Sequence, residues 1–150
     1  MRIVVQRVRH GRVELPVEAR AAGEIGQGLV LLVGVQRGDD AAVAEWCARK
    51  LAGLRIFEDG GGKMNLSIAE VAGARVLAVP NFTVGCDIGR GRRPSFDAAM
   101  APEAAEGLFE GFVATLRDED IAVETGVFGA EIRVELVNDG PVTFVIEHPR

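Results

Sequence analysis

The chain has 150 residues, which favours one domain and is long enough to bury a core without disulfides or metals. The formal net charge of −5 argues against a protein coated in nucleic acid, and no run of about 18 apolar residues predicts a membrane span. Arginine and glutamine interrupt the N-terminal stretch, which is therefore not typical of a secretory signal. We expect a cytoplasmic protein.

Residues 1–8 alternate in the manner of a β-strand, with Ile3, Val5 and Arg7 on one face. A charged side chain on an apolar face either extends its guanidinium back to water or binds a specific partner. Arg7 is therefore a candidate for a defined structural or functional role.

Residues 28–35 are a continuous apolar run, typical of a strand that is buried on both faces. The spacing then changes to that of a helix over residues 39–54, where Asp39 and Asp40 are candidate caps. Cys47 lies on the apolar stripe of this helix, so we interpret it as a core residue.

Residues 55–68 predict a strand, a glycine turn and a second strand. The glycines do not form a phosphate-binding loop, because Lys63 is followed by methionine and the upstream glycine is absent. Residues 74–84 predict a strand that Pro80 interrupts. A second helix is expected over residues 102–116, with the proline in its first turn.

The last third predicts three strands, over residues 121–129, 130–137 and 141–148. Asp139-Gly140 between the last two is typical of a hairpin turn. Pro141, however, has no N–H to donate to a β-ladder, and it makes the preceding peptide bond a candidate for cis. Base rates alone favour trans for such a bond.

Residues that could act as nucleophiles are Thr83, Cys86 and Ser95, but the only bases available to them are two remote histidines and ordinary carboxylates. The two histidines and two cysteines are widely spaced, which predicts neither a metal site nor a disulfide framework. We expect no cofactor.

The loop between Pro80 and the second helix concentrates Arg90, Arg92 and Arg93. Such a patch can bind a few phosphates while the rest of the surface stays acidic. The alternative is a solvated arginine loop with no ligand.

Several segments in this order, over nearly the full length, resemble the D-aminoacyl-tRNA deacylase family, also called D-tyrosyl-tRNA deacylase. The segments are MRIVVQRV, GEIGQGLVLLVGV, LRIFED with GKMNLS, GRRPSF, VETGVFGA and VNDGPVT. With the elements above, the predicted fold is α+β: a single domain over residues 1–150 with largely antiparallel or mixed β-sheets, a barrel-like core and two main helices.

The resemblance implies a homodimeric hydrolase, with the active site at the subunit interface, that cleaves the ester of D-aminoacyl-tRNA or glycyl-tRNA at the 3′ end. One pocket motif falls on residues 80–84. The other is a cis Gly-Pro pair, here Gly140 and Pro141, which reaches into the partner's pocket to reject L-amino acids. Arg7 matches an arginine that braces this pair.

The resemblance assigns catalysis to backbone N–H groups near Phe82 and Thr83, which bind the developing oxyanion, while the ribose 2′-OH of the tRNA assists the attacking water. Pro80 and Asn81 would contact the substrate, and Arg90, Arg92 and Arg93 are candidate tRNA contacts. The resemblance implies neither metal nor cofactor, and no membrane or DNA partner.

The first motif departs from the family pattern, because Pro80 and Asn81 replace its usual serine and glutamine. A sister branch in animals also has proline first, with a trans Gly-Pro pair and relaxed selectivity. Phe82, Arg7 and the NDGPVT segment match the main branch, which favours cis.

Three alternatives follow from these residues. Thr83 could act as a nucleophile. The chain could be a hydrolase of small esters that depends on Cys86 or Thr83. It could also be a non-catalytic or relaxed-specificity RNA-binding dimer that uses the arginine loop.

Overall fold

The computed structural model describes residues 1–89 and 92–148. Two helices and a set of eight strands form the described chain. The helices are α1 (Ala41–Ala52) and α2 (Pro102–Asp118), with short 3₁₀ helices η1 (Ile68–Glu70) and η2 (Phe82–Gly85). The strands are β1 (Arg2–Leu15), β2 (Arg20–Ile25), β3 (Gly28–Gly34), β4 (Phe57–Glu58), β5 (Met64–Leu66), β6 (Arg75–Pro80), β7 (Val123–Thr125) and β8 (Arg133–Glu147).

Six strands form one mixed sheet in the order β2-β1-β3-β6-β7, with β8 on the other side of β1. The pairs that involve β1 are antiparallel, whereas β3-β6 and β6-β7 are parallel. Strands β4 and β5 form a separate hairpin. This architecture confirms the predicted α+β class with a mixed, barrel-like sheet and two main helices.

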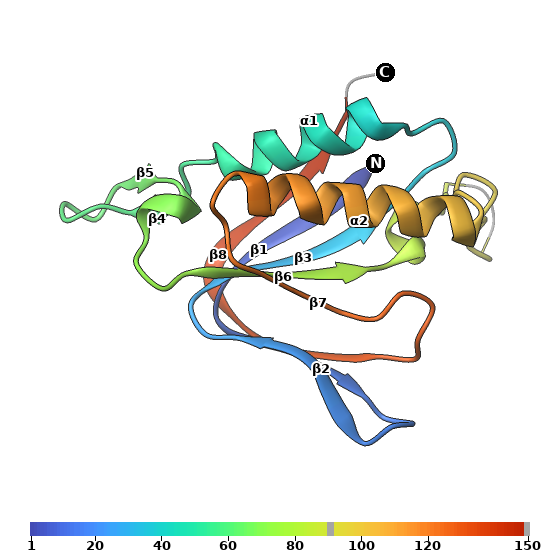
Figure 1. Ribbon diagram of the computed structural model, residues 1–150, viewed down its shortest axis with the longest axis horizontal. Helices are drawn as coiled ribbons and strands as arrows, with labels where there is room; N and C mark the ends of the chain where they lie inside the picture. The colour runs from blue at the N-terminus through green and yellow to red at the C-terminus, as the bar shows by residue number, and fades with distance from the viewer. Residues whose placement is uncertain (90–91, 149–150) are drawn as a thin grey trace.

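The larger core lies between the sheet and the two helices, which run side by side over one face (Figure 1). Alternate residues of the central strands enter it, such as Leu29 and Leu31 of β3. Their neighbour Val30 enters a second core on the opposite face. The prediction that residues 28–35 are buried on both faces is therefore confirmed.

The predicted cap of the first helix is also confirmed, since Asp40 accepts a hydrogen bond from the backbone N–H of Val43.

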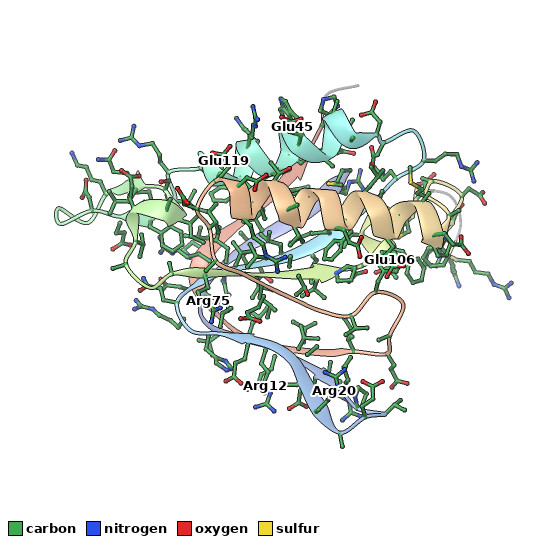
Figure 2. The ribbon with its side chains drawn as sticks, viewed as in Figure 1. Arg12, Arg20, Glu45, Arg75, Glu106 and Glu119 are labelled. Atoms are coloured by element: carbon green, nitrogen blue, oxygen red, sulfur yellow. The ribbon has the colours of Figure 1, made fainter. Side chains whose placement is uncertain are left out.

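Cys47 is fully buried, as its place on the apolar stripe of this helix predicts, and burial raises the pKa of its thiol to about 11. Arg49 of α1 pairs with Glu45 of the same helix and with Glu119 just beyond α2, and the second pair links the two helices; both glutamates are labelled in Figure 2. In the described residues, no helix is long and apolar enough to span a bilayer.

The predicted hairpin at Asp139-Gly140 is wrong. Strand β8 pairs antiparallel with β1 on both sides of this dipeptide, from Arg133 to Glu147. The chain therefore keeps its direction, because the pairing with β1 on either side outweighs the local preference for a turn. Residues 121–129 are likewise a strand only over β7, and the following segment is a loop.

Candidate functional site

A cavity of about 310 Å³ opens between the ends of β3 and β6 and the start of α2. Its walls are almost entirely apolar. The lining residues are Val33, Val35, Pro80, Asn81, Phe82, Ala99, Met100, Pro102, Ala105, Phe128 and Gly129. Three of the predicted site residues, Pro80 to Phe82, thus lie together in a cavity large enough for a small organic group.

The motif of residues 80–84 bends out of the sheet because β6 ends at Pro80 and η2 starts two residues later. Asn81 donates its N–H to the carbonyl of Val33 (2.8 Å), which holds the start of the turn against β3. Gly34 makes this contact possible, since a Cβ there would lie 3.1 Å from the nitrogen of Gly85 and 3.2 Å from the carbonyl oxygen of Asn81.

Asn81 caps η2. Its Oδ1 accepts the backbone N–H of Thr83 (3.1 Å) and the hydroxyl of Thr83 (2.6 Å). The N–H of Thr83, predicted as an oxyanion donor, is therefore already occupied within the protein. Its hydroxyl donates to an amide oxygen, which is not a general base, so the geometry gives no support to Thr83 as a nucleophile.

Phe82 differs from Thr83. Across the described residues, its backbone N–H has no acceptor within the protein, and the residue is 61% exposed. It is the first residue of a 3₁₀ helix, where an N–H has no intrahelical partner. A free backbone donor at the wall of an apolar cavity can bind an anion or a carbonyl oxygen that develops negative charge.

Arg7 is buried, with only 7% of its side chain exposed. Its Nη1 donates to the carbonyl of Ile56 (2.6 Å), and its Nη2 lies 3.6 Å from Glu58. Its Nε lies 3.2 Å from Asp139, within ion-pair distance but without hydrogen-bond geometry. The arginine on the apolar face therefore has specific partners and does not simply extend to solvent.

Gly140 and Pro141 form the exposed tip of a turn that bulges from β8 beside Arg7, and the peptide bond between them is cis. Asp139, the residue before this tip, lies 3.1 Å from Arg9 as well as near Arg7. Arg7 therefore contacts the residue that precedes the pair, and braces the tip through it.

The tip and the cavity are separate within one chain. Pro80 pairs with Val33, which pairs with Ile3, whereas the tip lies beside Arg7, four residues along β1. Along the strands, four residues span about 13 Å, and across the sheet the three strand spacings from β8 to β6 span about 14 Å. These two displacements are perpendicular, so the tip and the cavity lie on the order of 20 Å apart along the sheet. Neither Gly140 nor Pro141 lines the cavity.

The loop that carries the arginines is closed by two backbone hydrogen bonds between Asp87 and Ser95 (2.9 and 2.8 Å). Arg92 and Arg93 are exposed on it, and Arg90 lies outside the described residues. Phe96 follows this closure, and its ring lies 5.2 Å from the ring of Phe82. The loop therefore brings Phe96 against Phe82 at the wall of the cavity, and it carries two exposed positive charges.

Sequence reasoning identified only three of the eleven residues that line the cavity and missed the other eight. Ala99, Met100 and Ala105 carry no polar chemistry, and Phe128 follows a strand that was predicted too long. Their role comes from the packing of α2 and the loop after β7 against β6. The only indication in the sequence is that Phe128 falls in VETGVFGA, one of the segments that carry the family resemblance.

The family model for D-Tyr-tRNA(Tyr) deacylase matches residues 4–147. Two bacterial proteins named D-aminoacyl-tRNA deacylase are similar over their whole length. The protein from Koribacter versatilis is 54% identical, and the match covers 98% of this chain and 97% of that protein. The protein from Geobacter sulfurreducens is 49% identical, and the match covers 98% of this chain and 95% of that protein.

Two solved structures share the fold. One, titled c-Myc DNA Unwinding Element Binding Protein, superposes with a TM-score of 0.90 and is 35% identical, with all of both chains covered. The other, titled as a probable eukaryotic D-amino acid tRNA deacylase, has a TM-score of 0.77 over 97% of this chain and 98% of its own, at 17% identity. The latter likeness concerns the fold alone.

The cap at Asn81 leads to a stability prediction. We expect Asn81→Ala to lower the free energy of unfolding by about 1 kcal/mol, because the variant loses the acceptor for two hydrogen bonds. This corresponds to a melting temperature lower by about 2–4 °C, measurable by calorimetry. Asn81→Asp keeps an acceptor oxygen and should retain most of the stability, so equal melting temperatures for the two variants would contradict the assignment.

Proposed function

Because the chain belongs to the D-Tyr-tRNA(Tyr) deacylase family, we propose that it hydrolyses the ester between a D-amino acid and the terminal adenosine of tRNA. The products are the free D-amino acid and tRNA, so the reaction proofreads chirality in the cytoplasm. Glycine mischarged on tRNA-Ala is a further substrate in this proposal, since glycine has no side chain to reject. The single observation that carries the proposal is the free N–H of Phe82 at the wall of the cavity.

We assign the oxyanion to this N–H. Water adds to the ester carbonyl, and the charge that develops on the carbonyl oxygen is bound by the Phe82 N–H. The carbon–oxygen bond to the ribose then breaks, and the ribose oxygen takes a proton. One such donor contributes about 2.7–4 kcal/mol to the stability of the transition state. The substrate's own 2′-OH assists the water, which agrees with a Thr83 hydroxyl that donates to an amide oxygen and not to a base.

The second part of the proposal is a homodimer in which the tip of one chain completes the cavity of its partner. The separation of Gly140 and Pro141 from Pro80 within one chain supports it, since a single chain cannot bring the two together. Strand β8 also supports it, because among the described strands it pairs only with β1 and exposes Val137, Phe144 and Val145. An exposed apolar edge strand is a common surface for a second copy.

Selectivity then follows from sterics. A backbone tip placed beside the substrate's α-carbon leaves room for a hydrogen there and excludes a side chain of L configuration. The D side chain points away from the tip, so its identity matters little. Rejection by the main chain requires no particular side chain at Gly140 or Pro141.

We further propose that the loop beside the cavity binds the single-stranded 3′ end of the tRNA. Arg92 and Arg93 would contact phosphates, and the ring of Phe96 would stack on a base. The exposure of both Phe82 and Phe96, at 61% and 44%, supports this, because their neighbouring rings form an exposed apolar patch, and such patches often mark binding sites. Arg90 belongs to the same proposal by its place in the sequence.

The first prediction of the proposed function concerns chirality. We expect the protein to release tyrosine from D-Tyr-tRNA and to leave L-Tyr-tRNA intact in a single-turnover assay. Thr83→Ala should keep nearly the wild-type rate, because the hydroxyl takes no part in the chemistry. A loss of about a hundredfold or more in this variant would instead indicate a catalytic threonine.

Equal turnover of both substrates, or none of the D form, would overturn the proposal. Binding of tRNA without release of the amino acid would indicate a non-catalytic RNA-binding dimer. Activity on small esters that is lost in Cys86→Ser and does not require RNA would indicate the hydrolase alternative.

The second prediction concerns assembly. Sedimentation velocity should show a species of two 16.0-kDa chains at concentrations at which the enzyme is active, because each cavity needs the partner's tip. A monomer with full activity and full rejection of the L substrate would rule out the shared site.

The third prediction concerns the RNA. A plot of the logarithm of the binding constant against the logarithm of the salt concentration has a negative slope. Each arginine removed should make this slope less steep by about 0.7, and the double variant Arg92→Ala/Arg93→Ala should make it less steep by about 1.4. Phe96→Ala should weaken binding by about 1–3 kcal/mol with the slope unchanged, since stacking releases no counterions. Arg20→Ala, on the distant β1-β2 hairpin (Figure 2), is the control and should change neither quantity.

A further inference from the structure

The turn at Gly140 and Pro141 bulges out because, at this point, β8 has more residues than the stretch of β1 that it pairs with. Asn138 pairs with Val8 and Thr143 with Gln6, so four residues of β8 lie opposite the single residue Arg7. The extra residues leave the ladder and return to it. Such a bulge must be held by groups outside the ladder if its tip is to keep one position.

The side chain of Asn138 spans the base of this bulge. Its Nδ2 donates to the carbonyl of Val142 (3.2 Å) on the far side of the tip and to the carbonyl of Arg7 (3.0 Å) on β1. Both hydrogens of the amide are thus used. They tie the two ends of the bulge to each other and to the neighbouring strand.

The side chain of Asn138 also explains why residue 140 is a glycine. The φ angle of Gly140 is not positive, so the backbone conformation alone does not require glycine. A Cβ at this position would, however, lie 2.9 Å from Oδ1 of Asn138. The space beside Gly140 is therefore filled by the amide that holds the bulge, and any side chain there must displace it.

We propose that Asn138 is a positioning residue that sets the chiral selectivity of the site by fixing the tip at Gly140 and Pro141. The inference rests on the proposed function. Asn138 does not touch the substrate. It acts through the tip, which excludes the L side chain only while it stays in place. Arg7 and Asp139 hold the same turn through charge, so Asn138 is a second and independent attachment.

The test compares Asn138→Ala and Asn138→Asp with the wild type on D-Tyr-tRNA and L-Tyr-tRNA. The aspartate keeps the shape but donates neither hydrogen bond, and it turns an oxygen toward two carbonyls. We expect kcat/KM for the L substrate to rise tenfold or more in both variants, and that for the D substrate to change much less. Asn65→Asp, the same change on strand β5, is the control and should leave the ratio as it is.

A double variant tests the contact with Gly140. Gly140→Ala alone should displace the amide and relax selectivity as Asn138→Ala does. In the Asn138→Ala background the methyl group has room, so adding Gly140→Ala should cause little further loss. Unchanged selectivity in Asn138→Ala and Asn138→Asp, or full additivity of the two substitutions, would overturn the inference.

Hydrogen–deuterium exchange separates this outcome from a failure of the proposed function. The amides of residues 139, 140 and 142–144 should exchange faster in Asn138→Asp than in the wild type, whether or not the protein hydrolyses D-Tyr-tRNA. Faster exchange in a protein without deacylase activity would contradict the proposed function and would support the structural role of Asn138. Unchanged exchange in an active deacylase would contradict the role of Asn138 and would leave the proposed function standing.

Discussion

The buried guanidinium of Arg7 is the interaction on which the arrangement of the site depends. It extends from the middle of β1 and binds the carbonyl of Ile56, the carboxylate of Glu58 and that of Asp139. These partners belong to two segments distant in sequence, residues 56–58 and the turn at Asp139. Removing a partner of a buried charge is destabilising, because the charge stays buried with less compensation. The position of the turn at Gly140 is thus tied to the central strand of the sheet.

Two prolines mark the places where the chain leaves the ladder of the sheet. Pro80 ends β6 and leads into the turn at the cavity, and Pro141 lies at the tip of the bulge in β8. Neither has an N–H to donate, so neither could pair in the interior of a strand. The residues after Pro80 supply the free backbone donor, whereas those around Pro141 supply an exposed tip. A site made of main-chain groups is placed by the ends and irregularities of strands.

The replacement of the family's usual residues by Pro80 and Asn81 has a local effect that the structure makes visible. The shorter amide of Asn81 folds back onto Thr83 and occupies its N–H and hydroxyl. The Phe82 N–H stays available. The cap stabilises the turn at Asn81, and in the proposed function it leaves the Phe82 N–H as the oxyanion donor. The apolar shape of the cavity comes from α2 and Phe128.

The sequence by itself determined the α+β class, the buried strand at residues 28–35, the cap at Asp40 and the identity of the motif residues. These follow from periodicity and from short-range chemistry, which act within a few residues of the chain. It also marked Arg7 and Pro141 as exceptions to local rules, without showing their partners. Only the tertiary structure decided that β8 continues past Asp139-Gly140, because pairing with β1 outweighs a dipeptide's preference for a turn. It likewise decided which apolar side chains line the cavity, that Asn138 occupies the space beside Gly140, and that the Gly140-Pro141 tip lies far from the cavity within one chain. Those outcomes depend on contacts between residues distant in sequence, which no local pattern encodes.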